Sequence, residues 1–144
     1  MKQEHIKYLI EKRLLRKRLK DIPRIKSLIE SSQNNAEVTK SIKINEKSAT
    51  LIFREIYESI RQLGDAKWWL LDYESMSHES SMEILTEEEI KDKISLNKLY
   101  RFKRMRNDAN YRGYKVTVEQ AKEIVDFWNS CGEELIKKIK KELP

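Results

Sequence analysis

Apolar residues recur every three or four positions along most of this chain, with charged residues between them, and this spacing predicts amphipathic helices. The first such run covers residues 3–30. Its apolar positions are Ile6, Leu9, Ile10, Leu14, Leu15, Leu19, Ile22, Ile25, Leu28 and Ile29. Pro23 lies inside the run, and a proline in a helix interior removes a hydrogen bond and clashes with the preceding turn. We therefore expect a break near Asp21 and Ile22, with Asp21 capping the second piece.

A second long helix is predicted after a polar connector at residues 31–35. Its inward stripe comprises Ala49, Ile52, Phe53, Ile56, Ile60 and Leu63. Gly64 is expected to interrupt this helix, and a short continuation carries Trp68 and Trp69. We interpret the paired tryptophans as core or dimer-seam anchors, with ligand stacking as the alternative.

Two further capped helices are predicted in the second half of the chain. Thr86 and Glu89 have the spacing of a capping box, and so do Thr117 and Gln120. The apolar stripe of the first helix is Ile90, Ile94, Leu99, Phe102, Met105 and Ala109, and that of the last is Ala121, Ile124, Val125, Trp128, Cys131, Leu135, Ile136 and Ile139. A short helix near His78 precedes them. His78 could act as a general base, but no partner motif surrounds it, so we interpret it as structural or exposed.

These elements predict an all-α fold: an up-and-down antiparallel four-helix bundle with short extra helices, forming a single domain over residues 1–144. Composition agrees, because the chain has only three glycines and two prolines, too few for the many tight turns of a β-sandwich. Charged residues make up 38% and hydrophobic residues 39%, and long helices with one inward stripe accommodate both fractions.

The single cysteine, Cys131, lies at an apolar helix position and is interpreted as a buried, inert thiol. The chain opens on charged residues rather than a signal peptide, and no segment has the roughly 20 apolar residues that span a bilayer. We expect a cytoplasmic protein without membrane contact.

The net charge of +6 is unevenly distributed. Residues 1–26 carry ten Lys/Arg and three acids, residues 98–115 carry seven and one, and residues 71–92 carry eight acids and one lysine. Basic patches of this kind are electrostatic footprints for phosphates. The alternative is that they are solvated helix faces. For residues 1–26 the sequence favours both interpretations equally.

The most distinctive stretch is RFKRMRNDANYRGY, residues 101–114, with four arginines, two asparagines and two tyrosines. Lys103, Arg106 and Asn110 share one helix face and could present an ammonium, a guanidinium and an amide to a phosphate. Tyr111 and Tyr114 could stack on unpaired bases, although Tyr114 also suits the core at the end of a bundle. The alternative for the cations is that they only complement the helix dipole near its carboxyl end.

The pattern Arg106-Asn107-x-x-x-Tyr111-x-Gly113, on the third main helix of a small all-α chain, resembles the HEPN superfamily, and most closely its prokaryotic stand-alone members. The stretches that carry the likeness are LIFREIYESIRQLGDA (51–66), DYESMSHESSMEIL (72–85) and RMRNDANYRGYKV (104–116), of which the last is the most specific. The likeness covers residues 36–140.

This resemblance implies a bundle that forms a homodimer, with the motif helices of two protomers lining one cleft. Many HEPN proteins are metal-independent endoribonucleases, and others pair with a nucleotidyltransferase as toxin or antitoxin. Their catalytic signature is an arginine followed a few residues later by a histidine. Arg106 matches the arginine, whereas Tyr111 occupies the histidine position. Tyrosine, with a pKa near 10, is protonated at neutral pH and is a poor base.

Three interpretations therefore remain open. The first is a module that binds RNA or nucleotide phosphates through Lys103, Arg106, Asn107, Asn110 and Arg112, with a nucleotidyltransferase as a candidate partner. The second is a divergent ribonuclease in which Arg106 and Tyr111, with Asp108, replace the usual pair. The third is a protein–protein interaction module whose cations only aid solubility. None of them requires a cofactor or a metal.

Overall fold

The computed structural model describes residues 1–144, and the chain is mostly helical. The elements are α1 (Gln3–Glu11), β1 (Leu15–Lys17), α2 (Ile22–Lys40), α3 (Ala49–Leu70), β2 (Tyr73–Ser75), α4 (His78–Leu85), the 3₁₀ helix η1 (Lys93–Asn97), α5 (Lys98–Tyr111), α6 (Val118–Phe127), the π-helical turn η2 (Trp128–Gly132) and α7 (Glu133–Lys141). None of the helices combines the length and apolar character of a membrane-spanning segment.

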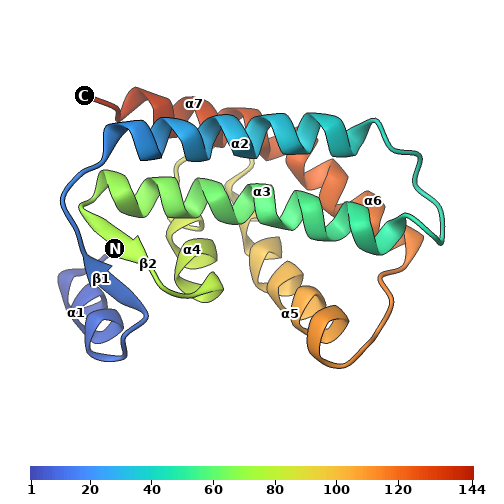
Figure 1. Cartoon of the computed structure of the whole chain (residues 1–144), viewed down its shortest axis with the longest axis horizontal. Helices are drawn as coiled ribbons and strands as arrows, with labels where there is room; N and C mark the ends of the chain where they lie inside the picture. The colour runs from blue at the N-terminus through green and yellow to red at the C-terminus, as the bar shows by residue number, and fades with distance from the viewer.

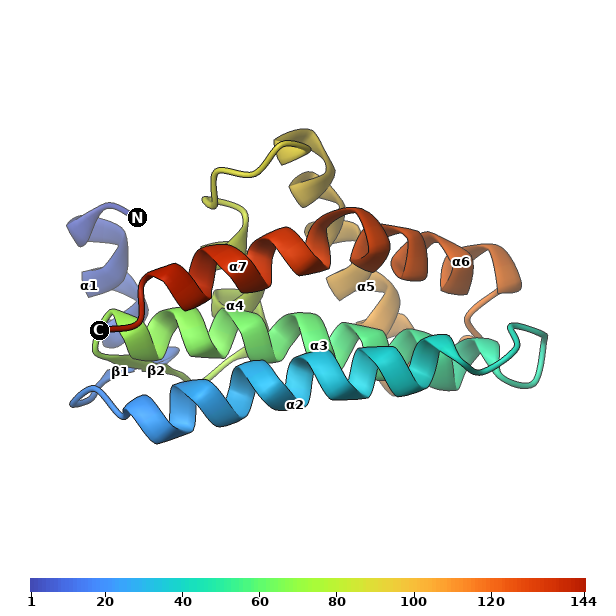
Figure 2. The same ribbon diagram turned by 90° about the horizontal axis from the view of Figure 1, so that it is seen from above.

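The helix α3 lies at the centre of the molecule, with the other elements on two sides of it (Figure 1). On one side, α2 runs antiparallel to α3, and the continuous rod α6–η2–α7 runs in the same direction as α3 (Figures 1 and 2). On the opposite side lie α1 with the small β1–β2 sheet, then α4, then α5 (Figure 1). The predicted all-helical class is thus confirmed apart from this two-stranded sheet.

One continuous hydrophobic core of 34 buried residues joins all these elements. The helix α3 contributes most of its length to the core, including Phe53, Tyr57 and Trp68, which are fully buried. Trp68 and Trp69 are core residues, as the sequence indicated, and the Trp68 indole donates a hydrogen bond to the Ser80 carbonyl at 2.8 Å.

The prediction of one kinked helix over residues 3–30 is wrong. The helix α1 ends at Glu11, and Arg13 has a φ of 60°, which an α-helix does not allow. The chain then forms β1, which pairs antiparallel with β2 in the register Leu15 with Ser75. The predicted cap is confirmed, because the Asp21 carboxylate accepts a hydrogen bond from the Arg24 N–H at 3.0 Å and begins α2.

The polar connector predicted at residues 31–35 is also wrong, because α2 continues through it to Lys40. Ser32 is fully buried there, and its hydroxyl donates to the Ser59 carbonyl of α3 at 2.6 Å, so this polar side chain is compatible with the helix interface. The actual connection is at residues 41–48. There the Asn45 carboxamide oxygen accepts hydrogen bonds from the N–H groups of Lys47 and Ser48, at 2.9 and 3.0 Å.

The region between α4 and α5 differs from the prediction as well. Thr86 follows α4, and its hydroxyl donates to the Glu83 carbonyl at 2.6 Å rather than capping a new helix. The next long helix begins only at Lys98, and Ile94, assigned to its inward stripe, is 83% exposed. The second capping box is confirmed, since Thr117 and Gln120 exchange hydrogen bonds of 3.0 and 3.1 Å at the start of α6.

Candidate functional site

The basic helix α5 is attached to α3 by a ladder of aromatic rings. Phe102 lies against Phe127 of α6, with ring centroids 5.5 Å apart, and against Phe53 of α3 at 6.2 Å. Residues four apart share one helix face. Arg106, one turn after Phe102, lies over the ring of Tyr57, one turn after Phe53.

Arg106 is held between two tyrosine rings. Its guanidinium carbon lies 6.0 Å from the centroid of the buried Tyr57 ring and 5.7 Å from that of Tyr111, whose side chain is 76% exposed. Guanidinium groups at such distances are attracted by the negative faces of aromatic rings. The Arg106 side chain is half-buried, and no carboxylate lies within 4 Å of it; its only side-chain hydrogen bond is a long one of 3.5 Å to the Asn107 carboxamide oxygen.

The Tyr57 hydroxyl is buried with no protein group to hydrogen-bond, although Tyr57 itself is only 1% exposed. Burial raises the pKa of Tyr57 to about 12, and the positive charges of Arg106 and Arg61 only partly oppose this shift. The hydroxyl is therefore a fixed donor at neutral pH. A buried donor without an acceptor is unfavourable, and such atoms are uncommon in folded proteins.

His78 completes the cluster from α4. Its ring centroid lies 6.1 Å from that of Tyr57, and its Nδ1 is likewise buried without a hydrogen-bond partner. Partial burial lowers the pKa of His78, and the charges of Arg106 and Arg61 lower it further, while Glu58 opposes them weakly. The imidazole is consequently neutral at physiological pH.

The helix α4 is fixed on α3 by a network beside this cluster. The Ser81 hydroxyl donates to the Asp65 carboxylate, which also accepts a hydrogen bond of 2.6 Å from Arg61. Burial raises the pKa of Asp65, while Arg61 and Ser81 oppose that shift. Arg61 also pairs with Glu58. Since its charge is thus neutralised by two carboxylates, Arg61 is a structural cation, whereas Arg106 is unpaired.

The structure separates the sequence-predicted site residues into two groups. Arg106, Asn107 and Tyr111 lie together. Lys103 points toward α4, where it pairs with Glu79 at 3.2 Å, and Arg112 lies beyond the helix, 3.8 Å from the Asp108 carboxylate. Asn110 is exposed without a side-chain hydrogen bond.

Sequence reasoning missed Tyr57 and undervalued His78. A signal for Tyr57 was present, because it continues the inward stripe between Ile56 and Ile60 and places a polar atom in an apolar row. No local pattern links His78 to Arg106, since they meet only through the packing of α4 and α5 on α3. Tyr114, favoured as a core residue, is exposed instead, because the chain turns away after Gly113 at a φ of 71°.

Comparison with protein-family models finds no match for this chain, and comparisons with curated proteins and with solved structures find none either. The function must therefore be inferred from the geometry. No group of three or more His, Cys, Asp or Glu side chains is arranged to hold a metal ion.

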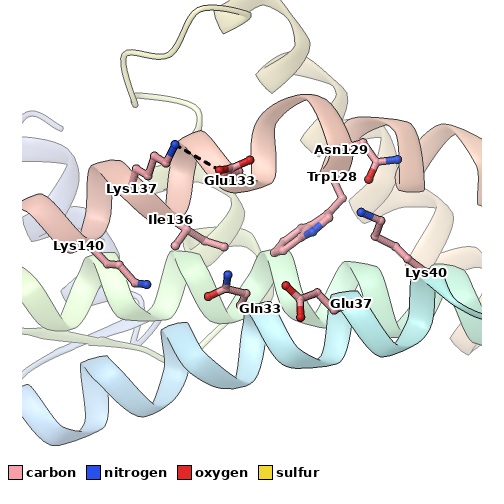
Figure 3. A pocket seen from close by; sticks show the side chains of 9 residues that line it. All are labelled: Gln33, Glu37, Lys40, Trp128, Asn129, Glu133, Ile136, Lys137 and Lys140. Atoms are coloured by element: carbon pink, nitrogen blue, oxygen red, sulfur yellow. Dashed lines mark ion pairs between the residues drawn. The ribbon is translucent and has the colours of Figure 1, made fainter.

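A separate hollow of about 370 Å³ lies on the other side of the molecule, between α2 and the η2–α7 rod (Figure 3). Trp128 and Ile136 line it together with Gln33, Glu37, Lys40, Asn129, Glu133, Lys137 and Lys140. Lys137 and Glu133, one turn apart on α7, form an ion pair at 3.2 Å along one edge of the hollow (Figure 3). Because lysines and glutamates alternate around this hollow, it lacks the one-signed charge that selects an anion.

The cluster at α3, α4 and α5 differs, because its one unpaired charge is the Arg106 guanidinium and the nearby carboxylates of Glu58 and Glu79 are paired with Arg61 and Lys103. A free guanidinium, a phenol hydroxyl and a neutral imidazole lie together, and all three can hydrogen-bond an oxyanion. Tyr111 adds an exposed ring beside the guanidinium, which is a surface for stacking a base. The arrangement suits a phosphate attached to a nucleobase.

Proposed function

We propose that this protein is a HEPN-like helical module of the cytoplasm that binds RNA or nucleotide phosphates at Arg106. One observation carries the proposal. Among the arginines that lack a carboxylate partner, Arg13, Arg16, Arg54 and Arg104 are exposed to solvent, and only Arg106 is half-buried. A partly desolvated, unpaired guanidinium is unfavourable in isolation, and a bound anion relieves that cost.

The neighbours of Arg106 indicate the kind of anion. Arginine makes bidentate hydrogen bonds to phosphates and carboxylates. Tyr57 and His78 supply two further polar groups without protein partners, which a phosphate, with more oxygens than a carboxylate, can use better. Tyr111 then provides a stacking face for the attached base.

The test compares Arg106→Ala with Arg104→Ala. Both substitutions remove one unpaired charge from α5, but Arg104 is exposed. Binding of a fluorescein-labelled tetrauridylate is measured by anisotropy. We expect Arg106→Ala to weaken binding by about tenfold or more, because hydrogen bonds to charged groups contribute about 1.5–3 kcal/mol. Arg104→Ala should change it little. Equal affinities for the wild type and Arg106→Ala, or no binding by the wild type, would exclude the proposal.

A second candidate function is metal-independent RNA cleavage with His78, rather than Tyr111, as the base. The observation that favours it is the neutral imidazole beside Arg106. A neutral histidine can accept the 2′-hydroxyl proton, and Arg106 can stabilise the charge that develops on the phosphorane. Tyr57 remains protonated and acts only as a donor, and Tyr111 acts as a stacking surface.

Cleavage of a structured RNA in EDTA tests this candidate. If His78 is the base, Arg106→Ala and His78→Ala should abolish cleavage, and Tyr111→Phe should preserve it. The opposite result for Tyr111→Phe would favour the alternative that the sequence left open, in which Arg106 and Tyr111 form the catalytic pair. If the wild-type protein binds RNA but does not cleave it, the cleavage function is excluded and the binding function stands.

The proposal includes a bundle that dimerises and a nucleotidyltransferase as protein partner, both drawn from the HEPN resemblance. The exposed end of α5, with Tyr111, is the surface that a second protomer would meet. Light scattering at micromolar concentration tests the dimer, and co-purification with the product of an adjacent gene tests the partner. Partner binding that survives Arg106→Ala without any RNA binding would favour the pure interaction module.

A further inference from the structure

A second basic surface lies at the N-terminal end of the molecule. Residues 12–20, KRLLRKRLK, contain six cations and no acid. Arg18 pairs with Glu74 at 2.8 Å, and Lys20 lies 3.9 Å from Asp72. The remaining four, Lys12, Arg13, Arg16 and Lys17, are exposed and have no carboxylate within 4 Å; we refer to them as the ribbon cations.

The backbone holds these cations in a fixed place. Leu15 is buried and anchors β1 in the core, and β1 pairs with β2 directly after the end of α3. The Leu14 carbonyl accepts a hydrogen bond of 2.9 Å from the Met76 N–H, and the Arg18 N–H donates to the Asp72 carbonyl at 2.9 Å. A pre-organised array of cations loses less conformational freedom on binding than a flexible tail does.

The α1–β1 segment, which carries the ribbon cations, and α5, which carries Arg106, lie on the same side of α3 (Figure 1). Two acidic residues of the intervening α4 region are paired with cations within the chain. Glu79 pairs with Lys103, and Glu87 pairs with the amino terminus. The surface between the two basic zones therefore repels a polyanion less than its count of acids suggests. Glu11, the last residue of α1 and the neighbour of Lys12 in sequence, forms no ion pair.

The separation of the two zones sets the size of a ligand that reaches both. Tyr57, beneath Arg106, and Leu70, just before β2, are thirteen residues apart on α3, about 20 Å at about 1.5 Å per residue. A stacked strand advances about 3.4 Å per nucleotide. About six nucleotides therefore separate the zones, and no mononucleotide can bridge them.

We propose that the ribbon cations bind the backbone phosphates of a single-stranded RNA whose other end lies at Arg106. This inference rests on the proposed function and deepens it, because it makes the ligand a polynucleotide rather than a nucleotide. RNA is favoured over an anionic membrane because Leu19, at 90% exposure, is the only largely exposed apolar side chain of residues 12–20, and the exposed apolar groups nearby, Tyr8, Ile10, Leu71 and Met76, are each less than half exposed. A stable peripheral membrane site combines basic residues with a larger apolar face.

The experiment uses the full chain and compares Arg16→Ser/Lys17→Ser with Lys43→Ser/Lys47→Ser. The second pair removes two exposed, unpaired lysines in the connection at the opposite end of α3. Binding of labelled U4 and U12 is measured over a salt series. For U12 we expect the ribbon variant to bind at least about tenfold more weakly, with a salt slope smaller by about 1.4, since each phosphate contact contributes about 0.7. U4 affinity should be unchanged, and the control pair should have little effect on either ligand.

The outcomes separate this inference from the function on which it rests. If Arg106→Ala weakens U4 binding but the ribbon variant does not weaken U12 binding, this inference fails and the proposed function stands. If Arg106→Ala leaves U4 binding unchanged, the proposed function fails. Ribbon-dependent binding to phosphatidylserine vesicles without ribbon-dependent U12 binding would also overturn the inference. Matching thermal unfolding curves exclude misfolding as the cause.

Discussion

Gly64 of α3 is in direct backbone contact with Ser81 of α4, and a Cβ at position 64 would lie 2.0 Å from the Ser81 carbonyl oxygen. This approach fixes α4, and with it the distance of His78 from Tyr57. We expect Gly64→Ala to lower the free energy of unfolding by about 2–3 kcal/mol, because overpacking outweighs the gain of about 1 kcal/mol in helix propensity. Urea denaturation measures it.

Gly113→Ala is the matched control for that substitution. No atom lies within 4 Å of its added Cβ, but φ is 71°, so a strain of about 1–2 kcal/mol is expected. Gly64→Ala should also weaken U4 binding, because it displaces α4 and His78. If the Gly64→Ala protein is as stable as the wild type, α4 is not held by this contact.

Tyr57→Phe should stabilise the unliganded protein. The substitution keeps the ring beneath Arg106 and removes a buried hydroxyl that no protein group satisfies. Removing a buried hydroxyl that lacks a hydrogen-bond partner should raise the free energy of unfolding by about 1 kcal/mol. The same variant should bind U4 more weakly if the hydroxyl contacts the phosphate. Reduced stability with unchanged binding would contradict both statements and assign the hydroxyl a structural role.

The sequence predicted elements well where a residue acts locally and poorly where its partner is distant. The Thr117–Gln120 box and the Asp21 cap lie within one turn of the groups they bind, and both are confirmed. The prediction that Gly64 interrupts its helix is wrong, because α3 continues through it to Leu70. The glycine instead allows the Ser81 backbone to approach α3, a contact that the sequence does not show. Intrinsic propensity was overridden by tertiary contact.

The candidate site shows the same limit. Arg106 and Tyr111 share one helix, so their proximity follows from spacing alone. Tyr57 and His78 join them through the packing of three helices, and that information resides in the whole core rather than in any local segment. The histidine of the Arg106 cluster thus comes from α4 and not from the segment around Arg106.

Cys131 is expected to be unreactive in the folded protein. It is fully buried, and burial raises the pKa of its thiol to about 11. At pH 8 the reactive thiolate is then on the order of one molecule in a thousand. Iodoacetamide should modify the thiol only in denaturant, as judged by mass spectrometry. Rapid modification of the native protein would mean that the core around η2 opens readily.

Tyr111 should contribute stacking rather than proton transfer. Its ring is exposed and lies beside the Arg106 guanidinium. We expect Tyr111→Ala to weaken U4 binding by roughly 5-fold to 150-fold, since a base–aromatic stack contributes about 1–3 kcal/mol. Tyr111→Phe should retain wild-type affinity. Equal losses in both variants, measured by the same anisotropy assay, would assign the effect to the hydroxyl instead.

His78 should make stability depend on pH in one direction. Burial, followed by the charges of Arg106 on α5 and Arg61 on α3, lowers its pKa in the folded state, with Glu58 opposing them weakly. The unfolded chain therefore binds a proton that the folded protein does not, once the pH falls below the ordinary histidine value of about 6.5. The stabilisation is fully present above that pH and is lost as the pH falls through the folded pKa.

His78→Gln removes this pH-dependent contribution, so the free energy of unfolding of the wild type minus that of the variant should decrease from pH 7.5 to pH 5. A difference that stays constant, or that grows toward acid pH, would show that His78 is protonated as easily when folded as when unfolded, and would remove it as a candidate base.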